Sequence, residues 1–178
     1  MKKVLYFATL LLCAVFTTSC EKEEVGSTAT ESMAGQWYVT VDAADASGNL
    51  VEGFEDLFGL GRVLMLTYNS SKNDPNELII DDLNNFWSFK VKTKCDQGNM
   101  TFSTTTSENN NLVADYEDIN VTITGGKIIP GGGVQNNGSK ADYIEFYVTF
   151  SDDSYPAKYG YASYKISGVR YSGLAEND

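Results

Sequence analysis

The sequence predicts an all-β protein, built as a barrel or a sandwich of about eight to ten strands. Three observations lead to this class. Short segments alternate apolar and polar residues with a period of two, as half-buried strands do. Turn-forming Gly, Asn, Asp and Pro residues separate these segments roughly every 8–15 residues. Only 50–60 shows apolar residues at helical spacing, and its glycines limit the length of any helix.

The first strand is predicted at 36–44, where Trp37 and two valines form an apolar face. A Trp near the start of a strand is expected to anchor the core, because its large ring contributes strongly to stability when it is buried. The segment 45–49 is predicted to be a tight turn. The segment 50–60 is predicted to be a short helix or an irregular flap.

The later strands follow the same pattern. The segment 62–68 is apolar on both faces, which indicates a central strand or one that lines a ligand cavity. The segment 86–95 alternates cleanly, with aromatic residues on one face and lysines on the other. The lysine stripe is either a solvated outer face or a site for an anionic group. The other predicted strands are 78–83, 100–106, 118–124, 127–129, 143–150 and 159–171, with 112–116 as a candidate for a further short strand.

Residues 1–19 have the three parts of a secretion signal peptide. A basic start precedes an almost wholly apolar run and a short stretch of small residues. The apolar run is shorter than the roughly 20 residues that a membrane-spanning helix needs. We therefore expect cleavage before Cys20, leaving a flexible acidic tether over 20–33 and one folded domain over 34–174.

The end of the apolar run is similar to the lipobox of bacterial lipoproteins, in which a small residue precedes Cys. The resemblance implies that Cys20 carries the lipid anchor, with acyl chains such as palmitate holding the chain on the membrane. The alternative is an ordinary signal peptide cleaved nearby, with Cys20 as a plain thiol. The charged residues 21–24 resemble the surface-export signal of Bacteroidetes lipoproteins, which implies an outer-membrane, surface-exposed location; the alternative is a solvated charge run.

The charge and cysteine content exclude several classes of function. The formal net charge of −11 argues against nucleic acid as a partner, because such binding depends on Lys and Arg neutralising phosphates. The same charge argues against electrostatic docking on anionic lipid. Once residues 1–19 are removed and Cys20 is acylated, Cys95 remains alone, so no internal disulfide is expected.

Catalytic groups are scarce in this sequence. It contains no histidine, so it cannot form a Ser-His-Asp triad, a Cys-His pair or a His-bound metal site. The acid pairs Asp81–Asp82 and Asp152–Asp153 consist of adjacent residues, which point to opposite faces of a strand. We expect these carboxylates to cap strands or to contact solvent, and we predict no catalytic residue, no metal site and no cofactor.

Six short segments of the chain occur in the same order and spacing in one known family. They are 35–39, 85–91, 124–128, 141–146, 149–153 and 167–173. On these segments the chain resembles the lipid-binding putative hydrolases, which are lipocalin-like lipoproteins of Bacteroidetes. The resemblance implies a lipocalin-like antiparallel β-barrel of about eight strands whose interior can hold an apolar molecule. It also implies that Trp37 of the first strand packs under Arg170 of the last and closes the barrel.

Three functions remain open. The first is binding of an apolar or amphipathic, lipid-like small molecule inside the barrel. The candidate lining residues are Leu64, Leu66, Trp87, Phe89, Phe146 and Val148. The second is a non-enzymatic interaction module, with a filled barrel or sandwich, that docks glycan or another envelope protein through its tyrosines. A carboxylate-pair hydrolase is the third option.

Overall fold

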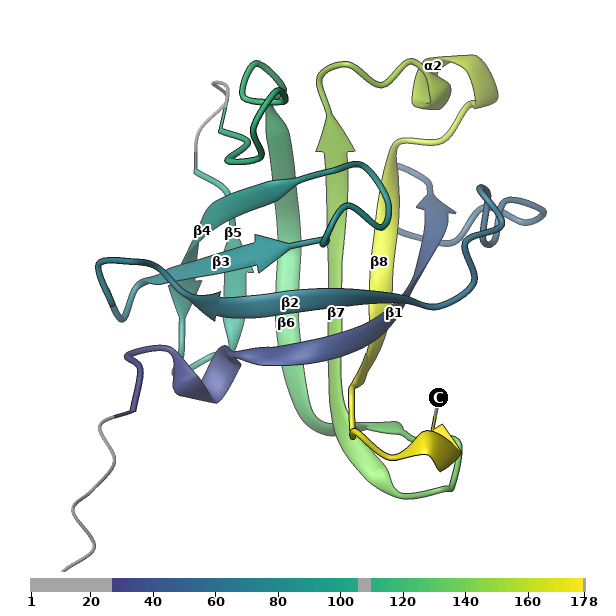
Figure 1. Cartoon of the computed structure of the whole chain (residues 1–178). Helices are drawn as coiled ribbons and strands as arrows, with labels where there is room; N and C mark the ends of the chain where they lie inside the picture. Colours follow the sequence, from purple (N-terminus) through teal and green to yellow (C-terminus); the bar gives the residue numbers. More distant parts are fainter. Residues whose placement is uncertain (1–26, 106–109, 178) are drawn as a thin grey trace, which may run out of the picture.

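The computed structural model describes residues 27–105 and 110–177. Within them the chain forms a closed barrel in which each strand pairs antiparallel with the next and β1 pairs with β8 (Figure 1). The strands are β1 (Gly35–Ala44), β2 (Val63–Asn69), β3 (Glu77–Asp81), β4 (Lys90–Asp96), β5 (Thr101–Ser103), β6 (Val121–Val134), β7 (Lys140–Phe150) and β8 (Ser163–Arg170). The described helical turns are η1 (Glu31–Met33), α2 (Tyr155–Tyr159) and η2 (Ala175–Asn177). The predicted all-β class and the predicted eight-stranded barrel are confirmed.

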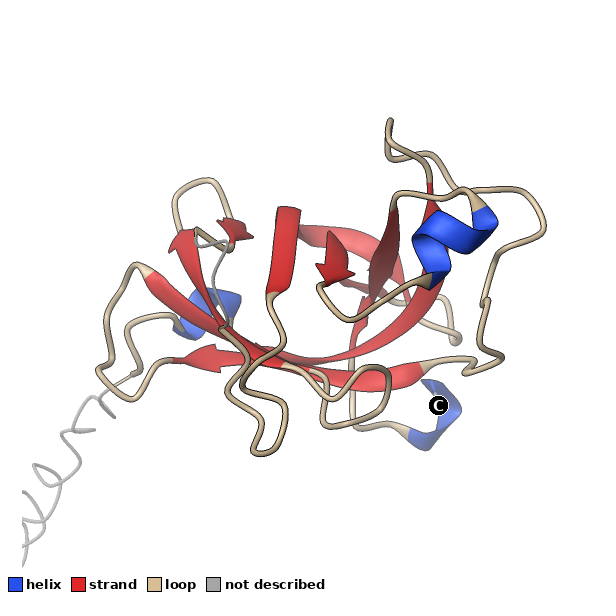
Figure 2. Ribbon diagram, turned by 90° about the horizontal axis from the view of Figure 1, so that it is seen from above, coloured by secondary structure: helices blue, strands red, loops and turns tan. Residues whose placement is uncertain are grey.

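The up-and-down order gives the barrel two different ends. Because strand direction alternates, every second connection lies at the same end. The four longer connections form what we call the mouth, over 45–62, 82–89, 104–120 and 151–162. The other end, called the floor, holds both termini of the barrel and the shorter connections 70–76, 97–100 and 135–139. Figure 2, seen from above, shows the strands curving around the interior, with α2 at the right.

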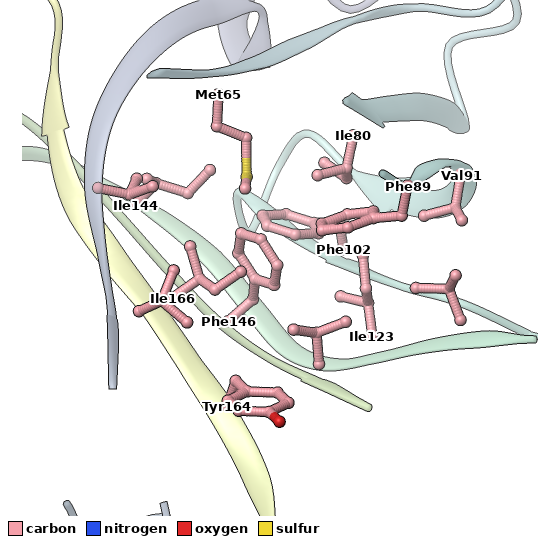
Figure 3. Close-up of a cluster of buried hydrophobic side chains, with 14 of the residues drawn as sticks. Met65, Ile80, Phe89, Val91, Phe102, Ile123, Ile144, Phe146, Tyr164 and Ile166 are labelled. Atoms are coloured by element: carbon pink, nitrogen blue, oxygen red, sulfur yellow. The ribbon is translucent and has the colours of Figure 1, made fainter. Parts of the chain in front are cut away.

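The interior of the barrel is filled by large apolar side chains from all eight strands. On β1, buried and less buried residues alternate, so that Trp37, Val39 and Val41 point inward. Figure 3 shows how side chains from opposite walls meet. The buried residues that it labels are Met65, Ile80, Phe89, Val91, Phe102, Ile123, Ile144, Phe146, Tyr164 and Ile166. Since these side chains occupy the centre, the structure is a packed barrel.

Several predicted elements differ from the structure. The segment 112–116 forms no strand but part of the β5–β6 connection. The segment 50–60 folds as successive turns rather than a helix. The segment 86–95 becomes a strand only from Lys90, because residues 86–89 belong to a hydrogen-bonded loop. The last strand begins at Ser163, because Pro156 lies in the first turn of α2 and favours a helix there.

One long strand replaces two predicted short ones. β6 continues through Gly125 and Gly126 and past Pro130, where the sequence predicted a bend and an end. Its pairing with β7 shifts register between Thr124 and Lys127 and again between Ile129 and Gly133. The glycine and proline signals therefore mark two bulges within a strand rather than breaks between strands.

The N-terminal predictions fall mostly on residues that the structure does not describe. The signal peptide at 1–19, the anchor Cys20 and the first part of the tether lie outside the described residues. Within the predicted tether, 31–33 form η1, and Met33 is fully buried in the core. Among the described residues, no helix has the length and apolar character needed to cross a membrane.

Candidate ligand-binding site at the barrel mouth

The floor of the barrel is closed where Trp37 of β1 meets Arg170 of β8. The two residues are register partners, and Cζ of Arg170 lies 4.5 Å from the centroid of the Trp37 ring. A side chain at position 35 would overlap the guanidinium, so Gly35 leaves the space that Arg170 occupies. Arg170 also donates from Nη1 to the carbonyl of Ala34 (2.6 Å) and from Nε to Asp142 (3.0 Å). These contacts join the first and last strands.

Further hydrogen bonds fix the underside of the floor. The indole Nε1 of Trp37 donates to Oγ1 of Thr67 (2.9 Å), which donates to the carbonyl of Met33 (2.6 Å). All three residues are buried, and Met33 brings η1 against the core. Since the floor is packed and hydrogen-bonded in this way, the mouth is the end at which a ligand can approach.

Two of the predicted lining residues lie on the outside of the barrel. Met65 pairs with Trp37, so Met65 and Thr67 are the inward positions of β2. Leu64 and Leu66 alternate with them and lie on the outer face, where both are half-buried. The prediction that they line the interior is therefore corrected. The run 63–66 is apolar throughout, so alternation in the sequence did not reveal the inward face.

The other four predicted lining residues lie inside the barrel or at its mouth. Phe89, Phe146 and Val148 are fully buried and pack in the interior. Trp87 is only half-buried, in the β3–β4 loop at the mouth. Its indole Nε1 donates to the carboxylate of Asp152 (3.1 Å), in the β7–β8 connection. Of these four residues, Trp87 is thus the one that a molecule arriving from solvent can contact at the mouth.

Six aromatic side chains, here called the mouth cluster, cover the interior at this end. Their neighbouring ring centroids are 5.0–6.4 Å apart. The members are Phe58, Phe86, Trp87, Phe150, Tyr155 and Tyr164. Trp87 and Phe150 stack with an interplanar angle of 10°, whereas most other pairs are tilted or T-shaped. Such pairs contribute about 0.5–1.5 kcal/mol each beyond the burial of their area.

The mouth cluster spans the boundary between core and solvent. Tyr164 and Phe150 form its buried lower layer. Phe58, Phe86 and Trp87 are half-buried above them, and Tyr155 is 38% exposed at the rim. Because its upper rings come from connections rather than from strands, they can separate without breaking the barrel's hydrogen bonds.

The β1–β2 connection lies over the mouth with an apolar underside. Its half-buried members that pack against the core are Val51, Phe54, Leu57, Phe58 and Leu60. The carboxylate of Asp56 accepts hydrogen bonds from the backbone N–H groups of Leu60 (2.7 Å) and Gly61 (3.0 Å). The backbone N–H of Asp56 donates to Asp42 of β1 (2.9 Å). The connection is therefore irregular but internally braced.

A buried carboxylate shapes the β3–β4 loop, which carries two members of the mouth cluster. Asp82 has no exposed surface and accepts four backbone hydrogen bonds. Its Oδ1 accepts from Asn84 (2.9 Å) and Phe89 (2.9 Å), and its Oδ2 accepts from Phe86 (3.2 Å) and Trp87 (2.9 Å). One side chain thus satisfies four of the eight backbone N–H groups of the loop and sets the position of Phe86 and Trp87.

The same loop has an unusual backbone conformation. Leu83, Asn84 and Ser88 all have positive φ, at 55°, 60° and 52°. Left-handed conformations are costly for residues other than glycine, and such residues cluster at functional sites. The buried Asn111 braces the end of the loop, since its side chain accepts from the N–H of Lys90 (3.0 Å) and donates to the carbonyl of Ser88 (3.1 Å). The surrounding structure therefore holds the loop in this shape.

Hydroxyl groups and a carboxylate form a polar chain beneath the rings. The hydroxyl of Tyr164 donates to Oδ2 of Asp153 (2.6 Å) and lies 2.7 Å from the hydroxyl of Tyr161. Burial, followed by the hydrogen bond to Asp153, raises the pKa of Tyr164 well above its usual value. Tyr164 therefore remains a neutral hydrogen-bond donor at physiological pH.

The predicted lysine stripe lies on the outer face of β4, away from the mouth cluster. The ammonium of Lys90 lies 3.0 Å from Asp81, and that of Lys92 lies 3.4 Å from Glu77. Lys94 is exposed on the same face. Two of the three lysines are thus engaged with carboxylates of the neighbouring strand, as expected for a solvated wall.

The mouth presents aromatic side chains and a few polar groups that a ligand can contact. Within residues 27–105 and 110–177, no three or more His, Cys, Asp or Glu side chains are grouped to hold a metal ion. Burial raises the pKa of the Cys95 thiol, which keeps it protonated and a poor nucleophile. What the mouth offers is aromatic surface over a packed interior, with carboxylates and a tyrosine hydroxyl beside it.

Sequence reasoning found one member of the mouth cluster and missed five. The five come from separate connections and strand ends, so no local pattern brings them together. One signal was present: the adjacent Phe86 and Trp87 follow 82–85, a polar stretch typical of a loop. Two large aromatic side chains next to such a stretch indicate either a buried anchor or a binding surface.

The fold and the mouth together define a small, packed antiparallel barrel with a cluster of aromatic side chains at one end. The family model described as lipid-binding putative hydrolase matches residues 22–175. The match covers most of the chain, and this protein belongs to that family. A search of curated proteins gave no match to this chain.

Proposed function

We propose that this protein is a cell-envelope lipoprotein whose barrel mouth binds an apolar or amphipathic, lipid-like small molecule. The observation that carries the proposal is the mouth cluster, in which the upper rings of Phe58, Phe86 and Trp87 are half-buried and are supplied by connections. The family's description as lipid-binding supports the same kind of ligand. Because the interior is packed, the ligand's apolar part would lie among Phe58, Phe86 and Trp87 after these rings separate.

The location of the protein is part of the proposal. The apolar run before Cys20 supports an acyl anchor on that residue, and the charged residues 21–24 support placement on the outer surface of the outer membrane. Labelled palmitate should enter the wild type and not Cys20→Ala. Protease treatment of intact cells should remove the barrel, and full protection would place it on the inner leaflet instead.

The binding site can be tested with a contact quencher. The chain without residues 1–19 and with Cys20→Ser would be titrated with 12-bromododecanol, whose bromine quenches only a tryptophan that it touches. We expect saturable quenching of Trp87, with the remaining emission from buried Trp37 unaffected. In Trp87→Phe the quenching should disappear although the aromatic mouth is kept. Absence of saturable quenching in the wild type, or its persistence in Trp87→Phe, would refute binding at the mouth.

A second function is favoured by the rim of the mouth. Tyr155 and Tyr159 are 38% and 42% exposed, and their rings stack 5.8 Å apart. Exposed tyrosines above a packed barrel suit a non-enzymatic module that docks glycan or another envelope protein. If the quencher does not bind, loss of glycan or partner capture in Tyr155→Ala, with capture kept in the outer-face variant Leu64→Ala, would support this alternative.

A further inference from the structure

Acidic side chains are concentrated at the mouth of the barrel. The described residues of the four mouth connections carry ten carboxylates and two cationic side chains. The carboxylates belong to Asp45, Glu52, Glu55, Asp56, Asp82, Asp115, Glu117, Asp118, Asp152 and Asp153. The cationic side chains belong to Arg62 and Lys158. The floor, over 27–34, 70–76, 97–100, 135–139 and 171–177, carries three carboxylates and one lysine.

Four lysines of the barrel wall do not neutralise this charge, because they pair with carboxylates of the wall itself. Lys127 and Lys165 both contact Glu145, at 2.7 and 3.2 Å. Lys90 and Lys92 contact carboxylates of β3, as described above. A molecule that approaches the mouth therefore meets a strongly negative potential, which attracts cations and repels anions.

The aromatic rim adds a second source of attraction for a cation. An ammonium or quaternary ammonium group is attracted to the face of a Trp or Tyr ring. In this structure the ammonium of Lys158 already lies 4.8 Å from the centroid of the Tyr159 ring at the rim. The exposed carboxylate of Asp152 lies against the indole edge of Trp87. Ring faces and carboxylate charge are thus placed together where a ligand's head group would emerge.

We infer that the ligand of this mouth is a cationic amphiphile: an apolar chain held by the mouth cluster and an ammonium head group held at the acidic, aromatic rim. The inference rests on the proposed function, since it names the class of ligand for the same site. An anionic amphiphile such as a fatty acid would place its carboxylate in the negative field and is disfavoured. A neutral amphiphile would bind through the burial of its apolar chain alone.

The test compares three ligands that share a twelve-carbon chain and differ in head-group charge. Dodecyltrimethylammonium, dodecyl sulfate and dodecanol would each compete with 12-bromododecanol, below their micelle-forming concentrations. At low salt we expect the ammonium to bind at least about tenfold more tightly than the sulfate, with the ratio falling as salt rises. Tetramethylammonium, which lacks the chain, should not compete.

Two triple variants that remove the same number of charges, one at the mouth and one at the floor, show which end of the barrel causes the preference for a cationic head group. Asp152→Asn combined with Glu52→Gln and Glu55→Gln should lower the ammonium-to-sulfate ratio, because it removes three of the ten mouth carboxylates. A floor variant that removes the same number of charges, by Glu31→Gln, Asp74→Asn and Glu176→Gln, should keep the wild-type ratio. Equal binding of both charged ligands to the wild type, or an equal drop of the ratio in the two triple variants, would overturn the inference. Failure of every ligand, dodecanol included, would instead reject the proposed function.

Discussion

Asp82 provides the most direct test of how the mouth is built. The change Asp82→Ala removes a carboxylate that four backbone N–H groups share, without touching the barrel's strand pairing. The change Asp82→Asn keeps the shape of the side chain. Because each carboxylate oxygen accepts two of the bonds, an amide in either orientation points its NH2 group at two N–H donors. We therefore expect Asn to replace Asp poorly.

The size of the effect follows from the exposure of the four donors. The N–H of Phe89 belongs to a fully buried residue, and leaving such a donor unsatisfied costs about 1–3 kcal/mol. The other three donors lie in a partly exposed loop, where water can replace the carboxylate, so each loses about 0.5–1.5 kcal/mol. We expect Asp82→Ala to lower the free energy of unfolding by about 3–5 kcal/mol. For a domain of this size, that lowers Tm by about 10 °C.

Two measurements distinguish a change confined to the β3–β4 loop from destabilisation of the whole fold. Thermal unfolding followed by circular dichroism gives the change in Tm. Quenching by acrylamide reports mainly on Trp87, because Trp37 is fully buried, and it should increase in both Asp82 variants. The exposed loop variant Asp118→Asn is the control and should shift Tm by no more than about 1 °C. A wild-type Tm together with wild-type quenching in Asp82→Asn would refute the role given to this carboxylate.

Three further predictions concern the barrel itself. A Cβ at Gly168 would overlap the carbonyl oxygen of Tyr38 on the paired strand β1, so Gly168→Ala should lower the free energy of unfolding in urea by about 3 kcal/mol or more. The control Gly98→Ala should lower it little, because the added Cβ would meet only the exposed side chain of Asp96, at 3.3 Å. Arg170→Ala should lower the free energy of unfolding by about 2–3 kcal/mol and change the fluorescence emission of Trp37, and Arg170→Lys should restore both in part. Unchanged stability and emission in Arg170→Ala would contradict the role of the Trp37–Arg170 contact in closing the barrel. Burial acts to raise the pKa of Glu145, but its two lysine partners outweigh burial and hold that pKa below the ordinary 4.5. The two ion pairs therefore stabilise the fold above about pH 4.5, and this stabilisation is lost as the pH falls through the lowered pKa of Glu145. Glu145→Gln should make Tm depend less on pH in the acid range. An unchanged dependence would count against the pairing.

The strands could be predicted where one face is apolar and the other polar. The alternation around Trp37 in β1 and around Phe146 in β7 appears directly in the burial of these strands. Leu64 and Leu66 could not be oriented, since both faces of β2 are apolar and the inward face depends on pairing with Trp37. A polarity pattern shows which face of a strand points inward only when one face is apolar and the other is polar.

The β3–β4 loop shows why the mouth could not be predicted from local patterns. Its sequence alternates well enough to predict a strand from 86 onward, yet Asp82 folds it back and three non-glycine residues take positive φ. Local propensity would not place Leu83 in a left-handed conformation. The conformation is held by the buried carboxylate of Asp82 and by Asn111, which comes from the β5–β6 connection more than 20 residues away.

The two ends of the barrel are built from different kinds of contact, and this difference bears on function. The floor is held by strand pairing, by the Trp37–Arg170 contact and by hydrogen bonds to the buried segment around Met33. The mouth is held by ring contacts between connections and by loop carboxylates. Opening the floor would break ladder hydrogen bonds, whereas opening the mouth exchanges one set of apolar contacts for another. A ligand that supplies apolar surface at the mouth can replace the ring contacts that it displaces, so a packed barrel remains compatible with binding at this end.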